Sequence, residues 1–248
     1  MEEMEADKLV KNAVIKANSP DEGDIEKING FTLEDLTAEQ VYTFKAVIGN
    51  NETDDRNLMP FSRKALEELA PLYIGKTMIK DHDPSADNQV ARVYDTEIRS
   101  DPEKTTGLGE PYAELIAKCY MAKTPENEGL ISEIKAGIKR EVSTGFAASS
   151  LRCSICGTDW VKSACAHRLG GEYEGKTCMR VIDGCSDAYE LSFVAVPAQP
   201  NAGTVKAAEK EPEEAPEKTE EEKALAEFAA KKAEIEKRLA ESREKFVF

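Results

Sequence analysis

The sequence of 248 residues contains only two histidines and one tryptophan, so any chemistry that needs an imidazole must use His82 or His167. It also lacks a continuous apolar segment of the roughly 20 residues needed to cross a bilayer, and we therefore expect no membrane association. The acidic start Met1-Glu2-Glu3 has no basic region of the kind that opens a secretory signal peptide. We accordingly expect reduced cysteines rather than disulfides.

Basic residues are also in short supply. The chain has 33 Lys and Arg against 48 Asp and Glu, which gives a formal net charge of −15. A general nucleic-acid binder normally presents a basic face to the phosphate backbone. The charge balance therefore argues against a nucleic-acid partner and favours protein partners.

Most of the six cysteines lie close together, and their spacing predicts a metal site. The pattern Cys-x-x-Cys presents two thiolates from one tight turn, and a second Cys/His pair completes a tetrahedron around zinc. The ligands predicted from this spacing are Cys153, Cys156, Cys165 and His167. Because four protein ligands leave no open position for water, we expect a structural zinc that stabilises an insertion over residues 152–180.

The one-residue gap between Cys165 and His167 is shorter than in most zinc fingers. Cys178 or Cys185 therefore remains an alternative for one of the four ligands. Free cysteines in a reducing compartment are the other reading of the same pattern.

With His167 assigned to the metal, His82 is the remaining imidazole for acid–base chemistry near neutral pH. We expect it in a strand over residues 77–82, where alternation turns Asp81 and Asp83 away from the ring. The carboxylate that orients the imidazole must then come from elsewhere. Glu190 and Ser143 each lie opposite the apolar positions of an expected strand, although strand Glu and Ser residues are most often solvated surface residues.

Short strands dominate the expected secondary structure. They are expected at 41–48, 77–82, 90–98, 112–120, 139–146 and 189–196. Helices are expected at 62–69, ending before Pro71, and at 126–138. This pattern predicts the α+β class, with a β-barrel-like core and flanking short helices.

The two ends of the chain differ in composition from the middle. We expect an acidic N-terminal arm over 1–36, a folded domain over 37–205 and a solvated linker over 206–218. An amphipathic helix is expected over 219–248, with heptad spacing of Leu225, Phe228, Ile235 and Leu239. That helix would pack on its own domain or pair with a second copy in a coiled coil.

Three segments, taken in order, resemble the prohead maturation proteases of tailed bacteriophages. They are Met78-Ile79-Lys80-Asp81-His82-Asp83, then Ser143-Thr144-Gly145-Phe146, then the run from Glu190 to Ala202 that contains Pro197-Ala198-Gln199-Pro200. The turn at Pro60-Phe61 also matches, and the resemblance covers roughly residues 41–205. It implies a serine endopeptidase on a barrel related to the herpesvirus maturation proteases, with Ser143 as nucleophile, His82 as general base and Glu190 as the orienting carboxylate.

The resemblance also implies the biological setting. The partners would be the major capsid protein precursor and the scaffold, and the site of action the immature procapsid in the host cytoplasm. The cysteine-containing insertion departs from the simpler members of the family, which have no cysteines in this region. Two other functions stay open at this point: a non-catalytic capsid assembly protein that uses the helical tail, and a zinc-dependent binding module.

Overall fold

The structure, a computed structural model, describes residues 20–200 and 202–205. The expected linker 206–218 and helix 219–248, with the first part of the arm, lie outside the described residues and stay predictions. The described helices are α1 (Glu22–Asn29), α2 (Arg63–Tyr73) and α3 (Glu128–Lys135). The described strands are β1 (Val41–Asn50), β2 (Thr77–Lys80), β3 (Ala91–Thr105), β4 (Pro111–Ala122), β5 (Val142–Cys153), β6 (Glu172–Tyr173), β7 (Lys176–Thr177), β8 (Arg180–Phe193) and β9 (Gly203–Val205).

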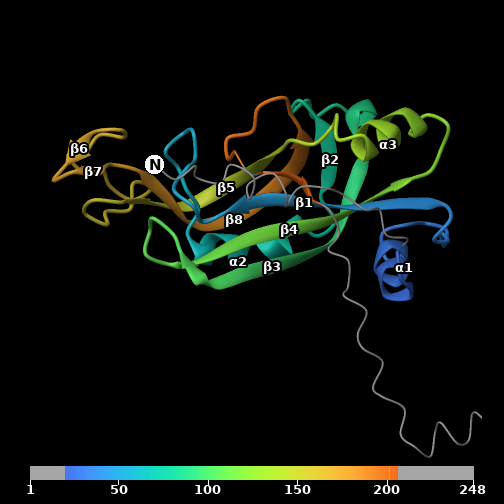
Figure 1. Cartoon of the computed structure of the whole chain (residues 1–248), viewed down its shortest axis with the longest axis horizontal. Helices are drawn as coiled ribbons and strands as arrows, with labels where there is room; N and C mark the ends of the chain where they lie inside the picture. The colour runs from blue at the N-terminus through green and yellow to red at the C-terminus, as the bar shows by residue number, and fades with distance from the viewer. Residues whose placement is uncertain (1–19, 201, 206–248) are drawn as a thin grey trace, which may run out of the picture. The chain divides into compact units, whose positions relative to one another are not determined.

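Seven strands form one sheet in the order β5-β8-β2-β3-β4-β1-β9, which confirms the α+β class (Figure 1). The β2–β8 pair is parallel and the other neighbours are antiparallel. The two end strands, β5 and β9, share no ladder in the described residues, and one antiparallel bridge between Glu141 and Gly203 connects the two edges. In the described part of the chain, where β9 comprises Gly203–Val205, the sheet is therefore not continuously closed into the expected barrel.

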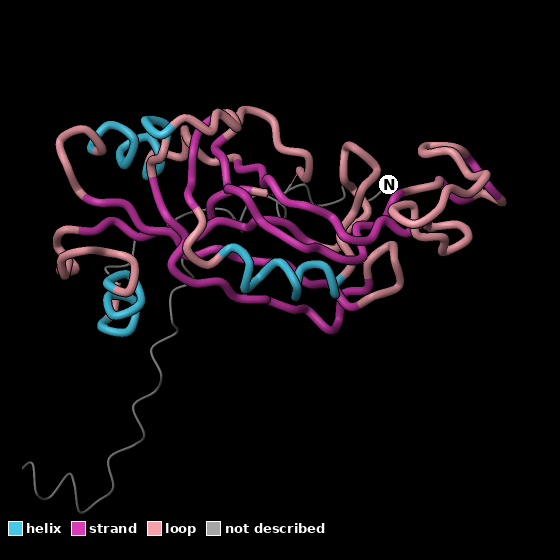
Figure 2. Tube along the Cα trace, turned by 180° about the vertical axis from the view of Figure 1, so that it is seen from behind, coloured by secondary structure: helices cyan, strands magenta, loops and turns pink. Residues whose placement is uncertain are grey.

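Helix α2 packs on the sheet and supplies part of the core (Figure 2). The Ser62 side chain accepts a hydrogen bond from the Ala65 N–H and caps the helix. Leu66, Leu69 and Tyr73 are fully buried. The sequence predicted an end before Pro71, but the helix runs on to Tyr73, because a proline in the last turn removes one N–H while burial of the Tyr73 ring favours the helical path.

Part of the expected N-terminal arm belongs to the folded domain. Helix α1 opens with a capping box between Asp21 and Asp24. Its Ile28 is fully buried in a small cluster with Tyr94 and Tyr120. The ammonium of Lys27 also lies 2.7 Å from the Asp95 carboxylate on β3. Residues 20–36 are therefore held against the sheet rather than extended from it.

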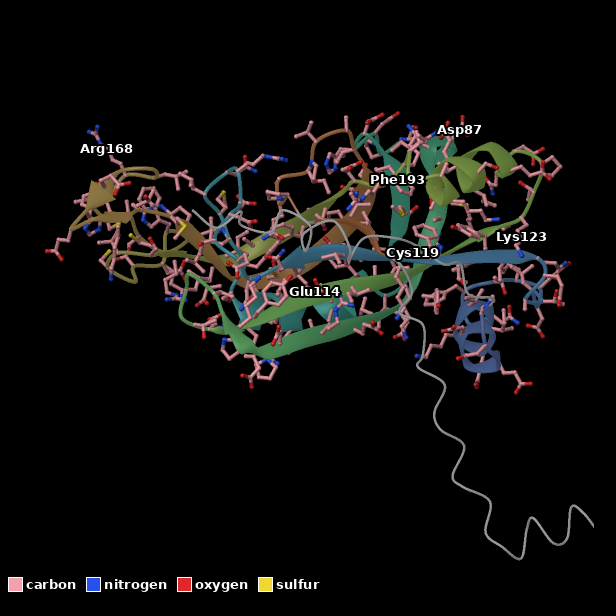
Figure 3. The ribbon with its side chains drawn as sticks, viewed as in Figure 1. Asp87, Glu114, Cys119, Lys123, Arg168 and Phe193 are labelled. Carbon is pink, nitrogen blue, oxygen red and sulfur yellow. The ribbon has the colours of Figure 1, made fainter. Side chains whose placement is uncertain are left out.

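The antiparallel ladder between β5 and β8 connects the two sets of candidate residues. It runs from the Val142–Phe193 pair at one end to the Cys153–Arg180 pair at the other. Figure 3 shows Phe193 beside β2 and Arg168 on the projecting insertion at the opposite end. At about 3.3 Å per residue, the ten steps from Ser143 to Cys153 span roughly 30 Å. The two sets of candidate residues thus lie at opposite ends of one ladder.

Candidate functional site

His82 lies just beyond β2 rather than within it. The strand ends at Lys80, and Asp81 and His82 both adopt left-handed backbone conformations, with φ of 54° and 56°. The expected strand over 77–82 is therefore wrong at its end, and strand alternation does not decide which acid meets the ring. Left-handed non-glycine residues cost about 1–3 kcal/mol and are kept where their surroundings hold them.

Two contacts from β8 hold this turn. The His82 N–H donates to Ser192 Oγ at 2.8 Å, and the Asp81 N–H donates to the Phe193 carbonyl at 2.9 Å. Ser192 is fully buried. Its hydroxyl therefore serves as a fixed acceptor for the His82 backbone, a role that the sequence analysis missed. The signal was available, because Ser192 follows Glu190 by two residues and so shares its face of the strand.

The His82 ring contacts the carboxylate expected for it. Nδ1 of His82 lies 2.8 Å from Oε1 of Glu190, whose side chain is 13% exposed. Oε2 of Glu190 is buried and has no hydrogen-bond partner. An unpaired buried carboxylate oxygen is costly, so the contact with His82 Nδ1 is the one side-chain partner that the described residues give this carboxylate.

Gly145 makes room for that carboxylate. Gly145 on β5 and Glu190 on β8 are directly opposite each other in the antiparallel ladder. A Cβ on Gly145 would lie 2.6 Å from Oε1 of Glu190. A side chain at position 145 would therefore displace the atom that contacts His82. Steric exclusion thus explains why the Ser-x-Gly-Phe segment has glycine at this position.

Ser143 lies on the same face of the sheet. Its cross-strand partner is Ser192, and Glu190 is two residues further along the same strand. In the described residues no hydrogen bond joins Ser143 to His82, whose backbone N–H and ring Nδ1 contact Ser192 and Glu190 instead. Ser143 is partly exposed, whereas Ser192 is buried and already bonded to the His82 backbone. Of these two serines, Ser143 is the one that a substrate could reach.

A cavity of about 210 Å³ opens beside Ser143 along the edge strand β5. Its wall is mainly apolar, and its polar residues include Asp55 and Gln199. The cavity is lined by Ile48, Asp55, Asn57, Met59, Phe61, Val142, Ser143, Thr144, Phe146, Ile182, Ala198, Gln199 and Ala202.

The metal ligands predicted from the sequence also come together. One ligand atom from each of Cys153, Cys156, Cys165 and His167 lies within 4.8 Å of the others. With Zn–S bonds near 2.3 Å, sulfurs at two corners of a tetrahedron are roughly 3.8 Å apart, so a small contraction would suit a bound ion. Gly157 has φ of 75°, which is why the turn after the second cysteine takes a glycine. This cluster could hold a metal ion.

The electrostatics of the cluster favour ligation. Hydrogen bonds from Thr158, and further ones involving His167 and Cys165, lower the pKa of Cys156 to about 6. The thiolate, which is the form that binds metal, is therefore accessible at neutral pH. Nδ1 of His167 is buried without a hydrogen-bond partner.

The two alternative cysteines lie outside this set of four. Sγ of Cys178 is 3.8 Å from Sγ of Cys153 and accepts a hydrogen bond from Arg180 Nη1 at 2.9 Å. Cys185 belongs to the main hydrophobic core, with its backbone N–H bonded to Glu68. The structure therefore favours the four ligands first predicted.

Arg180 and Trp160 form hydrogen bonds to residues of the cluster, which the sequence analysis did not anticipate. The Arg180 guanidinium lies 3.5 Å from the Trp160 ring centroid, and its Nη2 donates to the His167 carbonyl at 2.6 Å. The Trp160 indole N–H donates to Sγ of Cys165 at 3.1 Å. Such contacts orient ligands and tune their basicity.

Comparisons with known protein families, with curated proteins and with solved structures found no match for this chain. Among the described residues, no helix has both the length and the apolar composition to cross a membrane.

Proposed function

We propose that this protein is a serine endopeptidase in which Ser143 is the nucleophile, His82 the general base and Glu190 the orienting carboxylate. The observation that carries the proposal is the 2.8 Å contact between His82 Nδ1 and Glu190 Oε1. This contact fixes the proton on Nδ1 and leaves Nε2 as the nitrogen that can accept a serine proton. Ser143 is the accessible serine on the same face of the neighbouring strand.

The reaction follows from these positions. Ser143 Oγ forms a bond to the substrate carbonyl carbon while its proton passes to His82 Nε2. The C–N bond then breaks, and the same proton goes to the leaving amine. Water repeats the two steps on the acyl-enzyme and releases the acid. Through both halves, the Glu190 carboxylate stabilises the imidazolium.

The proposed substrates are the scaffold and the scaffolding segment of the major capsid protein precursor, within the immature procapsid in the host cytoplasm. Self-cleavage is included in the proposal. The support is the order and spacing of the three segments that resemble prohead proteases. The bridge between Glu141 and Gly203 brings the sheet edges together and supports an architecture derived from a barrel. The tail 219–248 is proposed to pair with itself or with assembly partners.

We further propose that the ion at the four-ligand cluster is a structural zinc. Three thiolates and one imidazole are a donor set that suits zinc. Ser143 lies roughly 30 Å along the ladder from this cluster. A metal at this distance could stabilise the insertion but could not touch the reacting atoms.

Mass analysis of the full chain, incubated alone and with its capsid precursor, tests the protease proposal. Wild-type protein should generate defined fragments, and Ser143→Ala should abolish them. Ser149→Ala is the matched control, since Ser149 is an exposed serine on the same strand. If Ser143→Ala cleaves like wild type, the serine-protease proposal is wrong. If wild-type protein is inert but still co-assembles with the precursor, the non-catalytic assembly function replaces it.

A further inference from the structure

The cavity beside Ser143 contains one charged residue, Asp55, in an otherwise apolar and neutral lining. Apolar walls come from β1, β5, β8 and the segment before α2, and include Phe61, Phe146 and Ile182. A group held here would lie beside the proposed nucleophile, so the cavity is placed to receive a substrate side chain.

Asp55 is an unusual wall residue because it is buried without a cationic partner. It is 6% exposed. Its Oδ1 accepts hydrogen bonds from the backbone N–H groups of Asn57 and Met59, at 2.8 and 3.0 Å. Both of these donors bind Oδ1 rather than Oδ2, and within the described part of the chain Asp55 forms no ion pair with a lysine or arginine. A buried carboxylate of this kind is costly unless a cation joins it.

The next residue, Arg56, forms hydrogen bonds elsewhere and does not pair with Asp55. The guanidinium of Arg56 donates to the Pro197 carbonyl, and its backbone N–H donates to the Ala198 carbonyl at 3.0 Å. Burial raises the pKa of the Asp55 carboxyl, and the nearby Asp54 acts in the same direction. The hydrogen bonds from Asn57 and Met59 oppose this rise in pKa, so the chain supplies two backbone donors to the Asp55 carboxylate but no cation.

The cavity wall is held in place before any ligand arrives. The Gln199 side chain forms two 2.8 Å hydrogen bonds with the backbone of Asn50, one as acceptor and one as donor. A Cβ at Gly49 would lie 2.9 Å from both Gln199 and Phe61, so glycine is what permits this close packing. A wall fixed in this way selects ligands by shape and charge rather than adapting to them.

We propose that this cavity binds the lysine or arginine side chain of the substrate residue whose carbonyl Ser143 attacks, with the Asp55 carboxylate pairing its cation. The inference rests on the proposed function, since it assigns the substrate class of the same site. The methylene stem of such a side chain packs on Phe61, Phe146 and Ile182, and its charged end reaches Oδ2 of Asp55.

Binding is tested without catalysis by using the full chain with Ser143→Ala. The probes are two blocked hexapeptides that are identical except for lysine or norleucine at the fourth residue. Their binding is measured by calorimetry or NMR. The lysine peptide should bind about tenfold or more tightly, the effect of one hydrogen bond to a charged partner. Asp55→Asn keeps an acceptor for both backbone N–H groups and should remove this preference. Asp54→Asn, an exposed neighbour outside the lining, should keep it.

Cleavage gives an independent readout with the wild-type chain. Values of kcat/KM should favour lysine and arginine over norleucine before the scissile bond, and Asp55→Asn should equalise them. Equal or undetectable binding of the lysine peptide overturns the inference, as does a preference that survives Asp55→Asn. If lysine and norleucine substrates are cleaved equally, the inference fails while the protease proposal stands. If nothing is cleaved, the protease proposal fails and the binding comparison alone decides the cavity.

Discussion

Replacing Gly145 by alanine should impair the site through a single atom. The added Cβ would lie 2.6 Å from Oε1 of Glu190, and 3.4 and 3.5 Å from Cδ and Cγ. Carbon–oxygen contacts in proteins lie at about 3.3 Å or more, so the carboxylate must move by about 0.7 Å. That shift exceeds the width of the 2.7–3.2 Å range in which N–H···O hydrogen bonds are found. The contact with His82 Nδ1 should therefore weaken or break.

The size of the effect follows from the bond that is lost. A hydrogen bond to a charged group contributes about 1.5–3 kcal/mol, and each 1.36 kcal/mol is a tenfold change in rate. Gly145→Ala should therefore lower kcat/KM about 10- to 150-fold. Stability should change little, because alanine in a strand gains about 0.5–1 kcal/mol over glycine and offsets part of the local crowding.

Peptide cleavage and thermal unfolding measure the two effects separately. Gly129→Ala in α3 is the matched control, because nothing lies within 4 Å of the added Cβ there. A double-mutant cycle with Glu190→Ala supplies the sharper comparison: if Gly145→Ala acts only through Glu190, it should cost nothing more in that background. Wild-type activity in Gly145→Ala, or an equal loss in the Glu190→Ala background, would refute the steric argument.

Two further predictions concern the other parts of the domain. Protein purified without chelator should contain about one zinc per chain, and Cys156→Ser should lower this content while peptide cleavage survives; chelation that stops cleavage without unfolding the insertion would contradict a structural role. Burial alone would raise the pKa of Asp95, but the ammonium groups of Lys27 and Lys118 lower it below its ordinary value. The resulting stabilisation is present above about pH 3.9 and is lost as pH falls through the lower folded-state value, so hydrogen exchange in α1 should quicken there. Asp95→Asn should exchange quickly at neutral pH as well, and equal protection in that variant would show that Ile28 alone holds the helix.

The sequence was most informative where chemistry depends on local spacing. The four predicted metal ligands lie within two short segments, so the gaps between them predicted a cluster, and the structure brings the four side chains together. Each of the six expected strands overlaps a strand of the sheet, since alternation of apolar residues is a local pattern, but the expected bounds covered only part of β5 and β8, and β9 was not expected. Long-range pairing was not predictable in the same way. Arg180, which bonds the His167 carbonyl, is thirteen positions away in the chain and has no spacing signal.

The contact between His82 and Glu190 could not be predicted from local spacing. Glu190 was selected because strand alternation was expected to turn Asp81 and Asp83 away from the His82 ring, yet His82 is not in a strand. The contact with Glu190 depends instead on the parallel pairing of β2 with β8 and on the left-handed turn that follows. Sheet order depends on contacts between distant segments. The left-handed turn has only a weak sequence signal, the enrichment of Asp and His at positive φ, which was not used for Asp81 and His82. The exclusion of Asp81 and Asp83 by strand alternation was therefore wrong, and the expectation of Glu190 keeps only the resemblance and the alternation within its own strand as its basis.

The β5–β8 ladder carries both sites and also separates them. Four register shifts interrupt it between Gly145 and Leu151. Each shift locally disrupts the ladder and increases its twist. Unfolding of the insertion would therefore have to extend through this irregular part of the ladder before it affected the pairing of Ser143. The Ser143–Ser192 pair is further tied to β2 through the His82 N–H and to the Gly203 edge through neighbouring Glu141. The geometry around His82 thus depends on three strands, β2, β5 and β8, and the cysteine-containing insertion extends only β5 and β8.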